Sequence, residues 1–97
     1  MPRPVTLLAD AIIEARAAFL WYRNRSDIAA ERFREEFHHA MDAIASSPDA
    51  WPTYVHATRR YLLRRFPFMV VYRVTPEEIQ VVAVAHARRR PGYWKER

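Results

Sequence analysis

The side chains of this sequence that are best suited to chemistry gather towards its C-terminal end. His86 is followed by a run of arginines, and Tyr93 lies close behind that run. Guanidinium groups bind phosphate or carboxylate oxygens in pairs, whereas imidazole and phenol groups can transfer protons. The arginines that we expect to bind an anion or a target are Arg59, Arg60, Arg64, Arg65, Arg88, Arg89 and Arg90.

Two interpretations of this basic set stay open. If the C-terminal strands are antiparallel neighbours, some of these arginines converge with His86 on one concave surface and form a phosphate clamp, with Tyr93 nearby. In a nuclease, the catalytic residues would be Arg60, Arg64, His86 and Tyr93. In the second interpretation, the arginine stems cover the sheet edges and His86 is hydrogen-bonded to the backbone.

The charge of the chain is unevenly distributed. Residues 1–55 carry six arginines and eight acidic residues, a net charge of −2, whereas residues 56–97 carry ten cations and three acidic residues, a net charge of +7. A basic half predicts an anionic partner, which is nucleic acid, an acidic peptide or an acidic protein surface. The excess of arginine over lysine is explained either by phosphate recognition or by a GC-rich genome.

Composition excludes several other kinds of site. The chain has no cysteine, which excludes a disulfide scaffold, a thiolate zinc site and a cysteine nucleophile. Its single glycine, Gly92, excludes glycine-rich phosphate loops and a nucleophile elbow. His38 and His39 are neighbours and point about 100° apart on a helix, so they do not readily share a metal. We expect no metal and no cofactor.

Length and hydropathy place the chain among small globular proteins. It has 97 residues, of which 51% are hydrophobic and 28% are charged, which predicts one domain over residues 1–97. No stretch reaches 18 uncharged apolar residues, and the first residues lack a signal-peptide pattern. We therefore expect a soluble cytoplasmic protein with no membrane partner.

The elements that position the basic residues begin with a strand and two helices. Residues 3–8 are typical of a short strand. Apolar residues then recur on one helical face, at Leu8, Ile12, Ala15, Phe19 and Tyr22. After a polar break, Ser26 or Asp27 caps a second helix that ends at residue 44 or 45. This pattern predicts an antiparallel helical hairpin over residues 9–45.

After residue 55 the pattern is typical of β structure. Runs of alternating, β-branched and aromatic residues, joined by short turns, predict antiparallel strands at residues 58–65, 68–74 and 79–87. We therefore predict an α+β fold, in which the N-terminal strand and the helical hairpin pack on a twisted, mainly antiparallel sheet of three to four strands. A basic tail, residues 88–97, follows the sheet over residues 58–87.

Two elements carry more apolar surface than this fold requires. In the last strand, simple alternation separates Val82, Val84 and His86 on one face from Ile79 and Val81 on the other. Both faces are apolar, which indicates a central strand or a face that a partner completes. The first helix has a stripe wider than its hairpin neighbour covers, through Ile13, Ala17, Leu20 and Trp21.

A succession of short motifs along the chain resembles a known superfamily. These motifs are Trp21-Tyr22, Ser26, residues 30–33, Pro48, Trp51-Pro52, residues 65–68, residues 71–74 and residues 83–94. In this order they resemble the ParE/RelE superfamily of type II toxins, also called plasmid stabilisation proteins. The resemblance covers residues 9–97, and the fold of that superfamily is a helical hairpin on an antiparallel sheet.

The resemblance implies a bacterial toxin that inhibits growth and that a small antitoxin neutralises in a hetero-oligomeric complex. We expect that antitoxin to be acidic and to fold as it wraps around the toxin. The residues predicted to bind it are Ile13, Ala17, Leu20, Trp21, Val82 and Val84. Two alternatives are a co-regulator that acts with its antitoxin at its own promoter, and a non-toxic relative that only binds its partner.

Two activities are known in the superfamily. RelE-like members cleave mRNA on the ribosome, with lysines on the first C-terminal strand or with a glutamate base there and Arg, His and Tyr. Residues 53–66 contain no lysine and no acid, so the base would have to be His56 or His86, and neither matches the pattern. ParE-like members inhibit DNA gyrase without evident catalytic residues. The His-Ala-Arg start of the tail resembles their motif, which favours the ParE-like branch.

Overall fold

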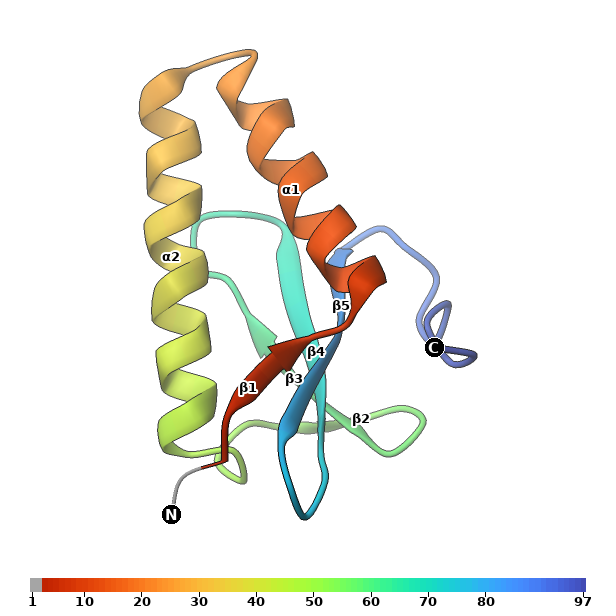
Figure 1. Cartoon of the computed structure of the whole chain (residues 1–97). Helices are drawn as coiled ribbons and strands as arrows, with labels where there is room; N and C mark the ends of the chain where they lie inside the picture. Colours follow the sequence, from red (N-terminus) through yellow and green to blue (C-terminus); the bar gives the residue numbers. More distant parts are fainter. Residues whose placement is uncertain (1–2) are drawn as a thin grey trace.

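Helices and strands follow one another in the predicted order, with one additional short strand after the helices. The computed structural model describes residues 3–97, so residues 1–2 of the predicted domain lie outside the described part. The elements, shown in Figure 1, are β1 (Val5–Leu7), α1 (Ala9–Arg23), α2 (Asp27–Ser46), β2 (Thr53–Tyr54), β3 (Thr58–Leu62), β4 (Phe68–Val74) and β5 (Ile79–His86).

The two helices form the predicted antiparallel hairpin. Ser26 is the N-cap of α2, and its hydroxyl accepts a hydrogen bond from the Ala29 amide at 3.2 Å. The amides of Arg25 and Ser26 donate to the carbonyl oxygen of Tyr22, which closes the end of α1. Because so few residues separate the helices, α1 and α2 lie side by side over the sheet (Figure 1).

The strands form one mixed sheet in the order β1-β5-β4-β3-β2. β1 pairs with β5 in parallel, and the other pairs are antiparallel. This arrangement confirms the α+β prediction, but the sheet has five strands rather than three to four. The missed strand is β2, which turns into β3 through His56 and Ala57, both with φ of 58°. Glycine or asparagine usually marks such a left-handed turn, and neither is present here.

A β-bulge changes which residues of β5 share a face. Val71 is opposite Ala83 and Tyr72 is opposite Val81, so Val82 is an extra residue between the two pairs. Val81 and Val84 both belong to the core beneath the helices, whereas Val82 and Ala83 belong to the cluster on the other face. The prediction that Val82 and Val84 share one face was therefore wrong.

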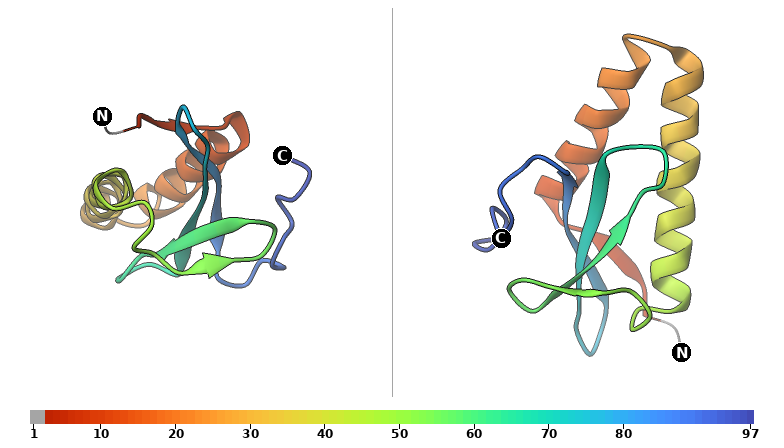
Figure 2. Two further views of the ribbon diagram at one scale, coloured as in Figure 1. Left: turned by 90° about the horizontal axis from the view of Figure 1, so that it is seen from below. Right: turned by 180° about the vertical axis from the view of Figure 1, so that it is seen from behind.

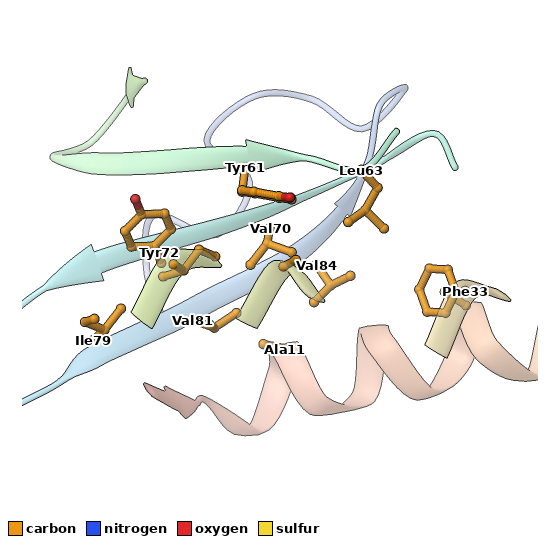
Figure 3. Close-up of a cluster of buried hydrophobic side chains, with 12 residues drawn as sticks. Ala11, Phe33, Tyr61, Leu63, Val70, Tyr72, Ile79, Val81 and Val84 are labelled. Atoms are coloured by element: carbon orange, nitrogen blue, oxygen red, sulfur yellow. The ribbon is translucent and has the colours of Figure 1, made fainter. Parts of the chain in front are cut away.

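The main core lies between the helical hairpin and one face of the sheet (Figure 3). Phe33 of α2 is 2% exposed, and its ring packs against those of Tyr22, Phe66 and Phe68. The fully buried Tyr72 donates its hydroxyl hydrogen to the carbonyl oxygen of Pro48 at 2.6 Å. Burial of such large side chains supplies about 1.5–3 kcal/mol each, which anchors α2 on the sheet.

The C-terminal tail covers the second face of the sheet. Trp94 is 2% exposed, belongs to the same buried cluster as Met69 and Ala85, and stacks on the ring of Tyr54 at 5.5 Å between centroids. Figure 2 shows the tail on the side of the sheet away from α2. Of the two explanations for an apolar β5, the central position holds, because β1 and β4 flank this strand and the tail of the same chain covers its other face.

Gly92 allows the tail to approach the β2–β3 turn. Its φ is +83°, and a Cβ atom at this position would lie 2.7 Å from Nε2 of His56. Any other residue would therefore combine an unfavourable backbone conformation with a steric clash. The positive φ and the close approach of His56 both require glycine at this position.

Candidate functional site

Glu14 fastens the C-terminal tail to α1. Its carboxylate accepts hydrogen bonds from the Val84 amide at 3.0 Å, from the Tyr93 hydroxyl at 2.6 Å and from both terminal nitrogens of Arg97 at 2.9 and 3.2 Å. Arg97 also forms an ion pair with Asp10 at 3.3 Å. The side chains of Glu14 and Arg97 are only 16% and 20% exposed, so this charged pair is shielded from solvent. We call these contacts the Glu14 latch.

The latch fixes the ionisation of its members. Burial, together with the hydrogen bond to the Glu14 carboxylate, raises the pKa of Tyr93 well above its ordinary value. Burial disfavours the charged form of Arg97, but its bonds to Glu14 outweigh that effect and raise the pKa of Arg97. Near neutral pH, therefore, Tyr93 keeps its proton and Arg97 keeps its charge.

Beside the latch is a cleft with a volume of about 440 Å³ between α1, the start of β4, the end of β5 and the tail. Most of its lining is apolar. Arg89 stacks on the Tyr93 ring, with its guanidinium carbon 3.9 Å from the ring centroid. The residues that line the cleft are Glu14, Ala17, Ala18, Trp21, Tyr22, Pro67, Phe68, Val84, His86, Arg89 and Tyr93.

His86 is oriented by the backbone of the tail. Its Nδ1 accepts a hydrogen bond from the Arg88 amide at 3.1 Å, and its ring lies edge-on to Phe68 at 5.1 Å. Because Nδ1 acts as the acceptor, the neutral ring carries its proton on Nε2. This is the backbone-bonded interpretation of His86 that the sequence left open.

Arg89 is the member of the predicted basic set that lies with His86 in the cleft, whereas the arginines of β3 do not converge with His86. Arg60 lies over the ring of Tyr54, 4.7 Å from its centroid, on the face of the sheet away from the helices. Arg59 donates to the carbonyl oxygen of Trp51 at 2.6 Å. β4 separates β3 from β5, and the alternation of side chains along β3 directs Arg60 away from the cleft.

The remaining predicted arginines are exposed. Arg64 and Arg65 follow β3, and their backbone amides donate to the carboxylate of Glu36 on α2. Arg88 and Arg90 project from the start of the tail. Of the predicted arginines, Arg89 alone lines the cleft within the part of the chain that the structure describes.

The residues predicted to bind an antitoxin fall into two groups. On α1, Ile13, Leu20 and Trp21 are 64%, 40% and 52% exposed, and Ala17 is exposed beside them. Val82 and Val84 are 1% and 2% exposed, so both side chains are buried, and of the two Val84 alone lies in the lining of the cleft.

Sequence reasoning missed Glu14 and Arg97. Within α1, Glu14 is the one acidic residue between Ala11 and Arg23, and such a carboxylate in a mostly apolar stretch of helix is a signal for a buried ion pair. No group of three or more potential metal ligands occurs within residues 3–97. Neither described helix has the length and apolar character needed to span a membrane.

The fold and the sequence are both similar to those of known proteins. The architecture is that of a solved structure titled "Chromosomal ParDE TA system from P. aeruginosa", with a TM-score of 0.64, 19% sequence identity, and coverage of 87% of this chain and 95% of the other. A family model described as "ParE toxin of type II toxin-antitoxin system, parDE" matches residues 5–91. The chain therefore belongs to the ParE toxin family. No curated protein sequence matches it.

Proposed function

We propose that this chain is a cytoplasmic, growth-inhibiting ParE-like toxin that acts by binding its target rather than by cutting it, and that the target is DNA gyrase. The observation that carries the proposal is that His86 and Tyr93, the two side chains predicted to transfer protons, are both already hydrogen-bonded within the protein. The Tyr93 hydroxyl is bonded to the Glu14 carboxylate, and Nδ1 of His86 is bonded to the Arg88 amide.

Cleavage of RNA through its 2′-hydroxyl would need a base, an acid and cations at one place. In the neutral His86 ring the free nitrogen already carries a proton, so it is a donor and not a base. Tyr93, with its raised pKa, is a poor acid near neutral pH. Arg60 lies on the opposite face of the sheet. These positions favour a binding surface made of exposed arginines.

The target is tested with purified protein in two assays run side by side. One assay follows supercoiling by DNA gyrase, and the other follows a translating extract with mapping of mRNA ends. We expect inhibition of supercoiling and intact mRNA. Ribosome-dependent mRNA cleavage without gyrase inhibition would instead identify a RelE-like endoribonuclease.

Toxicity is tested by induction of the chain in a bacterium. We expect growth to stop, and we expect co-expression of the short open reading frame beside its gene to restore growth, because the antitoxin covers the target-binding surface. The expected antitoxin is acidic, since residues 56–97 carry a net charge of +7. Normal growth at verified soluble expression would point to a non-toxic or co-regulatory relative.

The antitoxin complex should combine apolar contacts on α1 with charge pairs to the tail arginines. The Debye length falls from about 8 Å at physiological salt to about 3 Å at 1 M, so salt weakens exposed charge pairs but not apolar burial. We therefore expect high salt to slow association, measured by surface plasmon resonance, and to leave the complex intact in gel filtration. Complete dissociation at about 1 M salt would show that charge alone holds it.

A further inference from the structure

We propose that the cleft beside the Glu14 latch is the docking site for a bulky apolar side chain in an acidic peptide segment. The inference rests on the proposed function in one respect, since the antitoxin would supply that segment. It assigns the position and the chemistry of the contact, which family membership does not.

The shape of the cleft suits one large apolar side chain. A volume of about 440 Å³ lies in the range of ligand pockets. Ala17 and Ala18 of α1 line one side of the cleft, and their small side chains leave room for a bulky group. Phe68 and Val84 line the side formed by the sheet. Trp21 belongs both to the α1 side of the cleft and to the exposed apolar stripe of α1. A partner that inserts a side chain here therefore meets further apolar surface along the helix.

The positive charge at the cleft favours a peptide with acidic residues on either side of the inserted side chain. Glu14 is its one lining carboxylate within residues 3–97, and its charge is balanced by the bidentate bonds of Arg97. Arg89, over Tyr93, is the one arginine in the lining within residues 3–97, and Arg25 lies over Trp21 on the α1 side of the cleft. Neither arginine forms an ion pair with another described residue. Carboxylates flanking the inserted side chain would supply the missing partners.

A peptide fits this site better than a single-stranded nucleic acid does. Bases bind proteins by stacking on open aromatic faces. Here Arg25 lies 3.5 Å from the Trp21 ring centroid and Arg89 lies 3.9 Å from that of Tyr93, so each ring already has a guanidinium group on one face. What remains is an open, mostly apolar cleft, which suits a side chain.

The test uses the whole chain and a capped five-residue peptide in which tryptophan is flanked on each side by two glutamates. Two matched peptides carry glutamine in place of each glutamate, or alanine in place of tryptophan. Binding is measured from the NMR amide shifts of Val84 and Arg89. We expect the acidic tryptophan peptide to bind at least about fivefold tighter than either matched peptide, because each loses one kind of contact.

Two variants locate the site, each with a matched control. Ala17→Phe fills the cleft from an exposed helix position and should abolish the shifts, whereas Ala50→Phe adds the same group in an exposed loop and should leave the affinity unchanged. Arg89→Gln should remove the preference for glutamate over glutamine, and Arg23→Gln on the exposed side of α1 should retain it. Circular dichroism melts verify that each variant is folded.

Several outcomes would overturn the inference. The first is equal affinity for the three peptides, and the second is undiminished peptide binding by Ala17→Phe. Amide shifts at the cleft caused by oligothymidine would indicate nucleic acid as the occupant. Shifts caused by raising the protein concentration alone would indicate a second copy of the chain. If the chain binds the acidic peptide but does not stop growth, the docking site is supported and the proposed toxicity is contradicted. If the chain stops growth but the peptide causes no shifts at the cleft, only the docking site is contradicted.

Discussion

Simultaneous replacement of Arg88, Arg89 and Arg90 by glutamine should remove most of the toxicity, whereas His86→Gln should leave it largely intact. An exposed charged contact contributes up to about 1 kcal/mol, so loss of three weakens target binding by up to about 3 kcal/mol, or about 100-fold. Glutamine is close to histidine in size and also carries a hydrogen-bond acceptor, so we expect the start of the tail to keep its shape although the bond from the Arg88 amide to Nδ1 is removed. The substitution removes proton transfer and the edge-on contact of the imidazole with Phe68.

The measurement is survival after induction, together with the protein concentration that half-inhibits gyrase supercoiling. The charge-matched control replaces Arg23, Arg32 and Arg34 by glutamine on the exposed helix surface, which lowers the net charge equally and should retain toxicity. Loss of killing by His86→Gln alone, with folding and antitoxin affinity unchanged, would instead indicate proton transfer and favour a ribosome-dependent nuclease.

Glu14→Ala should destabilise the protein by about 3 kcal/mol, near the lower end of the 3–5 kcal/mol typical when one partner of a buried pair is removed. The substitution leaves the Arg97 guanidinium, the Tyr93 hydroxyl and the Val84 amide without their shared acceptor. For a domain whose total stability is about 5–15 kcal/mol, this is a large fraction. The tail should also separate from α1, because most of the lost bonds join these two segments.

Urea unfolding measures the loss of stability, and hydrogen exchange of the Tyr93 and Trp94 amides measures release of the tail. Glu31→Ala is the control, since its ion pair with Arg34 is more than half exposed on both sides and should contribute under about 1 kcal/mol. A Glu14→Ala protein within 1 kcal/mol of the parent chain, with unchanged exchange in the tail, would contradict the role assigned to the latch.

The helices and the long strands could be predicted from the sequence because their signals are local. The apolar spacing from Leu8 to Tyr22 indicated α1, and the Ser26 cap indicated the start of α2. β4 and β5 carry β-branched and aromatic residues in unbroken runs. The family resemblance rested on short motifs of the same kind, and the match over residues 5–91 confirms it.

The candidate site could be predicted only in part. Arg89, His86 and Tyr93 do line one cleft, because they lie within eight residues of each other. Arg60 does not converge with them, because side-chain direction across two strands depends on register rather than on residue type. The exposure of the apolar stripe on α1 could be predicted from the excess width of that stripe. The burial of Val84 could not be predicted, because it depends on how β5 packs in the sheet.

Local periodicity of the sequence thus determined the hairpin, the main strands and the basic character of the tail, because each depends on residues within one or two turns of one another. Tertiary structure alone decided the bulge at Val82, the β2 strand and the bonds of Glu14 to Arg97, 83 residues apart. All arginines carry the same guanidinium group, so residue type alone does not tell which of them pairs with the Glu14 carboxylate. Only the register of the sheet and the path of the tail bring Arg97, rather than another arginine, to Glu14.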